Sequence, residues 1–452
     1  MTNFNASEIK AQAKALLRLG GPLMVNNLAV AGMQFADAVM AGSLGARELA
    51  AVAVGGSFWF LGFSVCLGIL MAISPIVSRH FGARNFNLIG RYTRQGLYLA
   101  VLLGVPVILI GQFAAPPLLA AFGIDPEFLE LTAGYVGAIT FGAPGIFAFL
   151  ALRFTTEGIG HTRPIMYTSM FALICNVFLN YVLMFGHFGA PALGAVGCGW
   201  ASAISMWVVM SALAAYMLLN PRYRKFHLFS RLAPLRLSAF KEIFSLGLPI
   251  AVTITAEAGL FSAVSILMGT RGTNITAAHQ IAISFASTTF MIPLALSAAT
   301  TILVGQMIGA GRMRDARLAG IVGIVLCAAF MTISAVFLLI FRDAVVAMYT
   351  SDVAVTGIAI SLLLMAAIFQ IADGVQIGAA GALRGYKDTS VPMAINIFAF
   401  WVLAFPLAYL AAITYQAAPN YVWGGFIVGL GVAASLLTWR YNRLSRRSLG
   451  AA

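Results

Sequence analysis

Apolar runs long enough to cross a lipid bilayer recur from one end of this chain to the other. A transmembrane helix needs about 20 consecutive, mostly apolar residues. The hydrocarbon core contains no water to satisfy unpaired backbone groups, so such runs are expected to be helical. Polar and charged breaks divide the 452 residues into twelve runs, with approximate cores at 20–42, 49–77, 95–115, 131–152, 165–186, 194–219, 245–269, 276–304, 318–341, 354–382, 391–414 and 420–439.

The composition agrees with a membrane protein and excludes an ordinary soluble domain. Hydrophobic residues make up 61% of the chain, charged residues only 9%, and the mean hydropathy is +0.94. Soluble domains use apolar residues for about half of their length. The four cysteines lie inside apolar runs without metal-ligand spacing, so neither a disulfide nor a structural metal is expected.

The positive charge of the chain is strongly asymmetric across the predicted membrane. All but three of the 27 lysines and arginines fall on one side of the twelve spans, and the exceptions are Arg47, Arg271 and Arg342. The positive-inside rule assigns the basic side to the cytoplasm, with both termini there. We therefore expect a multi-pass membrane protein. The basic residues flank spans and form no separate basic domain, so a nucleic-acid partner is not expected.

The two halves of the chain repeat one another at a constant spacing. The segment at Leu19–Pro22 recurs at Leu246–Pro249, an offset of 227 residues (249 − 22). Without a gap, the same offset relates Gly45 to Gly272, Gly158 to Gly385 and Gly197 to Gly424. Chance does not hold one register over most of a half. The sequence therefore predicts an internal duplication.

The duplication predicts two lobes of six helices each. A polar segment at 220–242 divides the chain, so we expect an N-lobe at 1–227 and a C-lobe at 228–452. Six is an even number, so both halves begin and end in the cytoplasm and form parallel repeats. Transporters with this plan bind their substrates near the repeat interface and alternate access by rocking one repeat against the other.

Three carboxylates lie inside predicted spans: Asp37 in the first, Glu257 in the seventh and Asp373 in the tenth. No lysine or arginine is expected deep in a span to pair with them. An unpaired charge in hydrocarbon is costly, so each acid must be protonated, bind a cation or face a hydrated cavity. Such groups are natural sites of cation exchange. The alternative for each single acid is a hydrogen-bonded packing role.

Neutral polar residues accompany these acids along the same or neighbouring spans. Asn176 and Asn180 are four residues apart on the fifth span and therefore share one helix face. They could hydrogen-bond Asp37 or ligate a cation, and helix–helix contact explains the spacing equally well. The weaker candidates are Gln34, Asn26 and Asn27 on the first span, Thr253 and Thr255 on the seventh, and Gln370 and Gln376 on the tenth.

Three segments give the chain a family resemblance. The stretches MAGSLGARELAAVAVGGSFWF (40–60), VGQMIGAGRMRDARLAG (304–320) and LRGYKDTSVPM (383–393) resemble signature segments of the multidrug and toxic compound extrusion (MATE) transporters. Twelve spans in two lobes match as well, over essentially the whole chain. Acids in the first, seventh and tenth spans are similar to the NorM-type subgroup.

The resemblance implies a fold, a function and roles for the site residues. It implies an all-α integral membrane protein with twelve transmembrane helices in two pseudo-symmetric six-helix lobes. It also implies an N-lobe cation or substrate site of Asp37, Asn176 and Asn180, and a C-lobe cation site of Glu257 and Asp373. Either set is then a possible Na⁺ site. Some NorM-like members place an aromatic hydroxyl one turn before the tenth-span acid, where this chain has Phe369.

The sequence therefore predicts a secondary active antiporter that exchanges H⁺ or Na⁺ for amphipathic, mostly cationic drugs and dyes. We expect no cofactor beyond the coupling ion, contact with membrane lipid, and a monomer. One alternative is a flippase for a lipid-linked oligosaccharide or precursor, which would need basic residues deep in the cavity. An intramembrane enzyme is not expected, since no nucleophile–base or HExxH set is present. Three isolated acids do not form the selectivity ring of a channel either.

Overall fold

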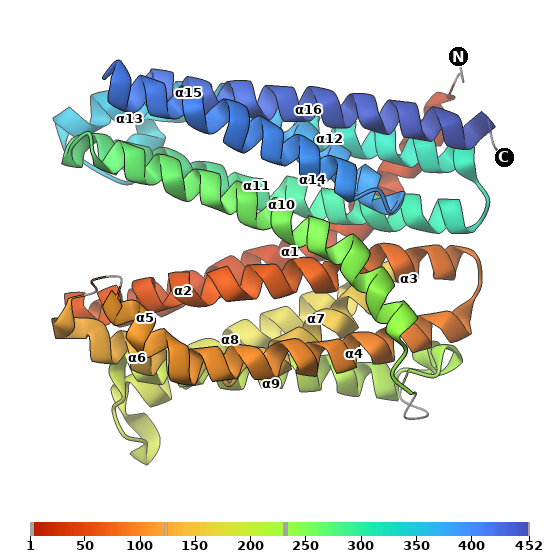
Figure 1. The fold of residues 1–452 in the computed structure, drawn as a ribbon, viewed down its shortest axis with the longest axis horizontal. Coiled ribbons are helices and arrows are strands. Elements are labelled where there is room, and N and C mark those ends of the chain that lie inside the picture. Colours follow the sequence, from red (N-terminus) through yellow and green to blue (C-terminus); the bar gives the residue numbers. More distant parts are fainter. Residues whose placement is uncertain (1–3, 122, 124, 229–233, 451–452) are drawn as a thin grey trace. The chain divides into compact units, whose positions relative to one another are not determined.

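The computed structural model describes residues 4–121, 123, 125–228 and 234–450, and their regular structure is helical. Arg231, counted above among the cytoplasmic basic residues, lies outside the described residues. In chain order the α-helices, together with the π- and 3₁₀-helices (η), are α1 (Ala6–Leu44), α2 (Ala46–Met71), α3 (Ile73–Gly82), α4 (Phe86–Leu109), η1 (Ile110–Ala114), α5 (Ala115–Ala121), α6 (Pro126–Thr140), α7 (Ala143–Gly158), α8 (Arg163–Phe185), η2 (His187–Gly189), α9 (Gly194–Leu219), η3 (Pro221–Phe226), α10 (Leu237–Gly269), α11 (Thr273–Gly309), α12 (Met313–Ala347), α13 (Val353–Gly385), α14 (Ser390–Ile397), η4 (Phe398–Ala404), α15 (Phe405–Tyr409), η5 (Leu410–Thr414) and α16 (Pro419–Gly450) (Figure 1).

Each predicted span coincides with one of these helices or with a run of adjoining ones. Within the described residues, ten helical segments are long and apolar enough to cross a membrane, and α6 with α7 forms one further span bent by 45°. The twelfth is α1, which has 39 residues. Its polar side chains, among them Asn26, Gln34 and Asp37, make it less apolar than the others. The chain is therefore a multi-pass membrane protein.

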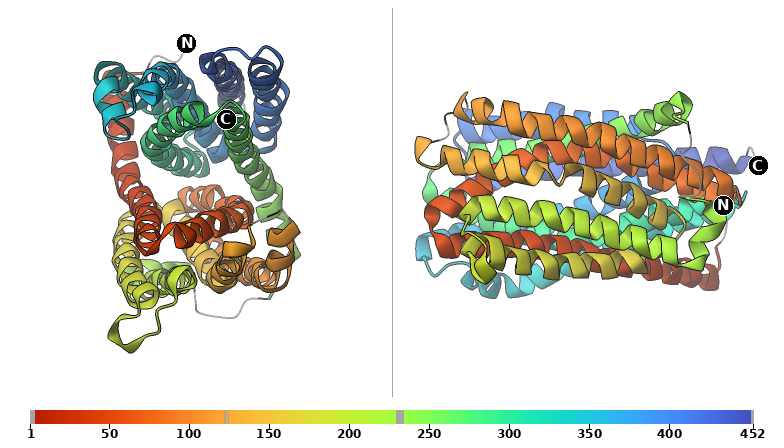
Figure 2. Two further views of the ribbon diagram at one scale, coloured as in Figure 1. Left: turned by 90° about the vertical axis from the view of Figure 1, so that its left-hand side faces the viewer. Right: turned by 90° about the horizontal axis from the view of Figure 1, so that it is seen from below.

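The packing divides the chain into two compact units. One contains Val25–Ala251, and the other contains Met1–Met24 together with Val252–Ala452. Within each unit, the long helices run side by side (Figures 1 and 2). The division differs from the lobe limits expected between residues 227 and 228, because α1 and α10 each contribute to both units. The division points in α1 and α10 are themselves related by the 227-residue offset.

The packing of the first turns of α1 and α10 explains why each of these helices is divided between the two units. In one unit, Gly20 of α1 packs on α11, where a Cβ at Gly20 would lie 3.2 Å from the Leu296 side chain. In the other unit, Gly247 of α10 packs on α2, where a Cβ would collide with the backbone of Ile69. The two contacts are related by the offset of 227, because Gly20 corresponds to Gly247 and Ile69 corresponds to Leu296. The start of each helix thus packs on the repeat that does not contain it in sequence.

The backbone also follows the repeat at its turns. Gly45 and Gly272 precede α2 and α11 with φ of 142° and 110°, in the region that favours glycine. The other repeat-related pairs with positive φ are Arg84 and Gly311 (58° and 75°), Gly160 and Lys387 (77° and 59°), and Gly189 and Gln416 (84° and 46°). The turns that connect equivalent helices therefore share a positive φ at equivalent positions.

Each unit has its own apolar core. In Val25–Ala251 the largest fully buried side chains include Phe147 and Phe226. In the other unit Phe369, Phe400 and Trp423 take this role. Packing between helices inside a bilayer depends on close fit rather than on exclusion of water. Small residues where helices approach each other are consequently sensitive positions.

Gly158 and Gly385 provide a test of the duplicated packing. A Cβ at either residue would lie 2.7 Å from a valine of its own unit, Val77 or Val304 respectively. We expect Gly158→Ala and Gly385→Ala to destabilise the protein to a similar extent, by about 1–3 kcal/mol, because both overpack a helix contact. Thermal unfolding of the detergent-solubilised protein measures this. Gly62→Ala on α2, with open space around it, is the control. A loss for only one of the paired variants would contradict equivalent packing.

Candidate functional site

The three membrane-embedded acids occupy two separate places, one in each compact unit. Asp37 lies on the part of α1 that belongs to Val25–Ala251 and is half-buried. Glu257 of α10, half-buried, and Asp373 of α13, 4% exposed, belong to the other unit. The sequence expectation of an N-terminal acid apart from a C-terminal pair therefore matches where the structure places these residues.

Asp37 is hydrogen-bonded by the asparagines of α8. Asn180 donates its Nδ2 hydrogen to Asp37 Oδ1 at 2.5 Å and is also 3.3 Å from Asn176 Oδ1. Both asparagines are buried, at 0% and 2% exposure. Their four-residue spacing does place them on one face, as predicted. The structure brings all three candidates of this set together.

Helix α9 completes the surroundings of Asp37 with two residues that the sequence analysis did not identify. Cys198 and Ser202 both hydrogen-bond the Asp37 carboxylate, and Asn176 Nδ2 donates to Ser202 Oγ at 3.5 Å. Their spacing of four residues is the same signal that pointed to the asparagines. Searching every span for polar and thiol pairs at this spacing would have found them.

The Asp37 site can therefore hold one negative charge or one exchangeable cation. Amide, hydroxyl and thiol hydrogens stabilise the ionised carboxylate. Because the Asn180 Nδ2 hydrogens point to Asp37 and Asn176, its Oδ1 atom is left buried and without a hydrogen-bond partner. A buried acceptor of this kind is costly unless another group binds it at some stage.

The second site combines Glu257 and Asp373 with unsatisfied polar atoms on α13. The charges of the two acids interact. Gln370 and Gln376 flank Asp373 at three-residue spacing and are 0% and 1% exposed. Among the described residues, neither amide atom of Gln370 has a hydrogen-bond partner, and Asp373 Oδ1 and Gln376 Oε1 have none either. Four orphaned polar atoms in two turns of a buried helix indicate a place where water, a cation or a substrate binds.

Helix α13, which carries Asp373, ends with a buried arginine. Arg384 is in its last turn and is 9% exposed. Hydropathy ended the tenth span at residue 382, but the helix continues to Gly385 with Arg384 directed inward. Glu157, which lies beyond the core of the fourth predicted span (131–152), is likewise buried in α7, with 2.7 Å between its Oε1 atom and Arg153 Nε.

Two of the weaker candidates lie on the helices that carry Asp37 and Glu257. Gln34 is exposed on α1, and Thr253 of α10 is half-buried. Among the residues that the structure describes, no group of three or more histidine, cysteine, aspartate or glutamate side chains could hold a metal ion. A site for a monovalent cation would use single carboxylates with amide or hydroxyl oxygens instead.

Comparison with known proteins identifies the family. The MatE family model matches the chain twice, at residues 22–182 and 249–410. The starting residues of the two matches differ by the same 227-residue offset as the internal repeat. The chain belongs to the MatE family.

Curated relatives place this chain in the NorM-type branch of the MatE family, and a solved structure confirms the fold. Multidrug resistance protein PmpM of Pseudomonas aeruginosa is 38% identical over 97% of this chain and 93% of its own. Multidrug resistance protein NorM of Vibrio vulnificus is 36% identical over 97% of both chains. The crystal structure of MATE in complex with MaD3S superposes with a TM-score of 0.89 over 97% of both chains, at 22% identity. The predicted twelve-helix, two-lobe fold is thus confirmed.

Phe369, which was noted above as the residue one turn before the tenth-span acid, lies in an aromatic cluster. Phe369, one turn before Asp373, is 2% exposed and packs edge-on against Phe261, Trp423 and Phe426. Nearby, Trp423 Nε1 donates to His279 Nδ1 at 3.2 Å, and Ser265 Oγ lies 3.0 Å from His279 Nε2. Both ring nitrogens of His279 therefore have partners, as a packing role requires. No oxygen from position 369 reaches Asp373.

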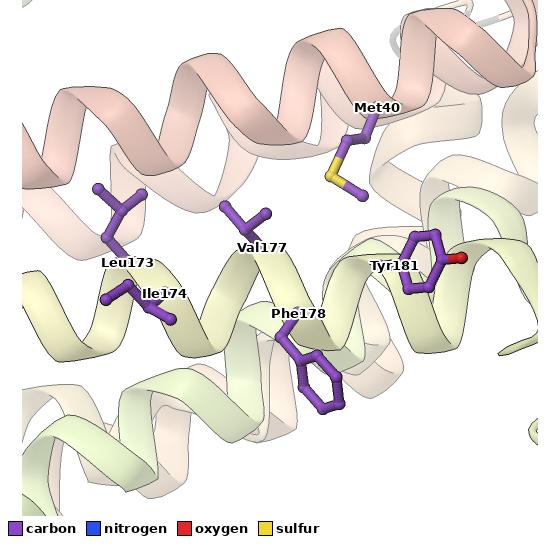
Figure 3. Close-up of a pocket in the computed structure, with 6 residues that line it drawn as sticks. All are labelled: Met40, Leu173, Ile174, Val177, Phe178 and Tyr181. Carbon is purple, nitrogen blue, oxygen red and sulfur yellow. The ribbon is translucent and has the colours of Figure 1, made fainter. Parts of the chain in front are cut away.

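An apolar pocket lies beside the Asp37 site in this MatE-family chain. It has a volume of about 510 Å³ and is lined by Met40, Leu173, Ile174, Val177, Phe178 and Tyr181. Figure 3 shows Met40 pointing from α1 toward α8, and Leu173 and Val177 pointing back from α8. No charged side chain lines it, so it suits hydrocarbon and not the coupling ion. Asn176 and Asn180 lie on the same helix, each next to a lining residue.

The hydrogen bonds of Asn180 predict an order of effects. We expect Asn180→Ala to destabilise the protein more than Asn176→Ala, by about 1.5–3 kcal/mol if the lost bond is to a charged carboxylate. Both asparagines hydrogen-bond Asp37, but the bond from Asn180 is the stronger one, with 2.5 Å between Asn180 Nδ2 and Asp37 Oδ1, and Asn176 Nδ2 also donates to Ser202 Oγ. Thermal unfolding in detergent provides the comparison. The reverse order would mean that the Asn180–Asp37 bond contributes little to the folded state.

Proposed function

We propose that this chain is a multidrug efflux antiporter of a bacterial inner membrane. It exchanges H⁺ or Na⁺ for amphipathic, mostly cationic drugs and dyes by alternating access. The observation that carries the proposal is the pair of separate sites, Asp37 in one unit and Glu257 with Asp373 in the other, in which Asp37 and Asp373 lie among polar groups. Membership of a family whose relatives are named multidrug resistance proteins supports it. The role is transport, with no enzymatic step.

At the N-terminal site, Asp37 is proposed to alternate between a bound cation and a drug. A carboxylate that binds either partner, but not both, couples their movement in opposite directions. Asn176 and Asn180 hold the carboxylate in place, together with Cys198 and Ser202. The apolar pocket between α1 and α8 offers a place for the hydrocarbon part of an amphipathic substrate.

At the C-terminal site, Glu257 and Asp373 are proposed to bind the coupling cation, with Gln370 and Gln376 as secondary ligands. The unpartnered oxygen atoms of Asp373 and the glutamines are suitable acceptors for a cation or for a water that carries a proton. Between the two ions we favour H⁺. The groups around Asp37 present N–H and S–H hydrogens, and Phe369 supplies no oxygen near Asp373.

The proposal includes an orientation and an assembly. Both termini are placed in the cytoplasm on the basis of the basic flanks of the spans. The lobes 1–227 and 228–452 are proposed as the functional halves, exchanging the first turns of α1 and α10 between their packed units. We propose a monomer in contact with membrane lipid. The second candidate, a flippase for a lipid-linked oligosaccharide or precursor, would need basic residues deep in the cavity, whereas Arg384 lies in the last turn of α13.

Neutralising Asp37 tests the N-terminal site. We expect Asp37→Asn to be inserted in the membrane in normal amounts but to confer no drug resistance on a sensitive host, because an amide cannot release and rebind a cation. Asp343→Asn is a matched control, since Asp343 is exposed (76%) near the end of α12. Minimum inhibitory concentrations, with membrane protein levels by immunoblot, provide the measurement. Normal resistance with Asp37→Asn would contradict the role of this site.

Gradients imposed across proteoliposomes test the coupling. We expect a pH gradient alone to drive dye transport, and Glu257→Gln or Asp373→Asn to reduce that transport to the rate seen without a gradient. Dye fluorescence is followed with a pH gradient, a sodium gradient, both or neither. Transport driven only by sodium would reverse our choice of ion. Transport that stays coupled in both variants would show that the C-terminal site is misassigned.

A further inference from the structure

Asn396 of α14 is a fully buried amide that belongs to neither of the two candidate sites described above. Its side chain is 0% exposed, and within the described residues neither its Oδ1 nor its Nδ2 atom has a hydrogen-bond partner. An amide side chain offers two donor hydrogens and an acceptor oxygen, so its burial without partners is costly. Unsatisfied buried groups of this kind indicate a place where water or an ion binds.

The buried face of α14 turns Asn396 toward α16. Ala399 follows Asn396 by three residues, so the two lie on one side of the helix. A Cβ on Gly429 of α16 would be 2.9 Å from the Ala399 carbonyl oxygen, which shows that this side packs on α16. Phe398, on the other side of the same turn, is exposed.

Gln376 of α13 approaches α16 from a second direction. Phe369 packs on Phe426 of α16, and Gln376 is seven residues, about two turns, beyond Phe369 on the same face. The two helices run in the same direction, because the ring pair Tyr386–Tyr441 occurs further along both. Gln376 therefore lies about two turns beyond Phe426 along α16.

Asn396 reaches the same level of α16. The chain enters α14 beside Arg440 of α16, since Asp388 pairs with it, with 2.7 Å between Asp388 Oδ2 and Arg440 Nε. Asn396 follows Asp388 by eight residues, and Ala433 precedes Arg440 by seven, so Asn396 lies beside Ala433. Ala433 is buried and is also two turns beyond Phe426. The amides of α13 and α14 therefore come together over a small side chain.

The two amides are level with each other but are not bonded to each other. Gln376 Oε1 has no partner in the part of the chain that the structure describes, and neither have the two amide atoms of Asn396. A bridging water satisfies such an arrangement. Asp373, one turn before Gln376 on the same face of α13, has an unpartnered Oδ1 atom as well.

We propose that Gln376 and Asn396 bind a buried water molecule beside Asp373, and that this water carries the exchanged proton between Asp373 and the end of the unit at the Asp388–Arg440 pair. The carboxyl O–H bond of Asp373 breaks and an O–H bond forms on the water. The water then releases another of its protons toward the solvent at that end, so that the water is regenerated and the carboxylate retains the negative charge.

The direction of this proton step is supported by Thr389. Thr389 is seven residues before Asn396 on the same face of α14 and is 4% exposed, and among residues 234–450 its Oγ1 atom has no hydrogen-bond partner. It adjoins Asp388, so the unpartnered groups continue toward that end of the unit. The inference rests on the proposed exchange of H⁺ for the role of the water. The water site itself does not depend on transport.

The water site is tested by the thermal stability of two Asn396 variants of the purified full chain. Asn396→Leu replaces the amide by an apolar group of similar size, whereas Asn396→Ser leaves a hydroxyl and room for a second water. We expect Asn396→Ser to unfold at the higher temperature, because a hydrated site favours a side chain that can hydrogen-bond.

A dry site gives the reverse order, and that result would overturn the proposal. Leucine would then remove a buried unsatisfied amide, and serine would leave a cavity. Asn420→Leu is the matched control in the same unit. The Asn420 amide oxygen accepts a hydrogen bond from Ser361 Oγ at 3.0 Å, so the control reports the same substitution at an amide that has a protein partner.

The proton-carrying role is tested in proteoliposomes with an internal pH indicator and an imposed ethidium gradient. We expect Asn396→Leu to slow proton movement several-fold, Asn396→Ser to recover most of the rate, and Asn420→Leu to match the wild type. Gln376→Leu combined with Asn396→Leu should be no slower than the slower single variant, because both side chains act through one water.

An unchanged rate in Asn396→Leu, or independent slowing by the two leucine substitutions, would overturn the role of the water. Transport that depends on sodium and moves no protons would overturn it as well. If the wild type shows no gradient-driven transport at all, the proposed antiport fails instead, while the stability order of the Asn396 variants still decides whether the water site exists.

Discussion

A carboxylate in the interior of a membrane protein persists only where other groups compensate its charge, and this requirement organises the structure around its three embedded acids. Asp37 receives hydrogen bonds from α8 and α9. Asp373 lies between two glutamines of α13 whose amide groups have unpartnered atoms within the described part of the chain. The compensation therefore differs between the two sites: hydrogen-bond donors at Asp37, and vacant polar atoms at Asp373.

The two repeats share the same backbone plan and packing but differ in the charged residues that they carry. Equivalent turns share the sign of φ, and Gly158 and Gly385 make the same close approach to a valine. Packing is thus preserved where helices contact each other. Charge is not preserved, since Asp37 corresponds to Val264, Glu257 to Val30 and Arg384 to Glu157. Two lobes with one backbone plan can therefore bind different partners.

Hydropathy predicted the twelve spans of the fold, and helical spacing predicted some of the residues of the candidate site. The twelve apolar runs coincide with spans because burial in a bilayer demands about 20 apolar residues for each helix. Helical periodicity predicted that Asn176 and Asn180 share one helix face. The same four-residue spacing could have identified Cys198 and Ser202. Arg384 and Glu157 were not, because hydropathy ends a span at the first charge, whereas both helices continue with the charged side chain turned inward. The exchange of α1 and α10 depends on tertiary contacts, which a pattern along one chain does not contain.

That exchange has a consequence for how the protein is made. The first unit to emerge from the ribosome needs the start of α10, through Ala251, before its packing is complete. The opening turns of α1, through Met24, find their partner α11 only after more than half of the chain has been synthesised. Cutting the gene between the two sequence halves would leave each fragment without a segment that its own core requires.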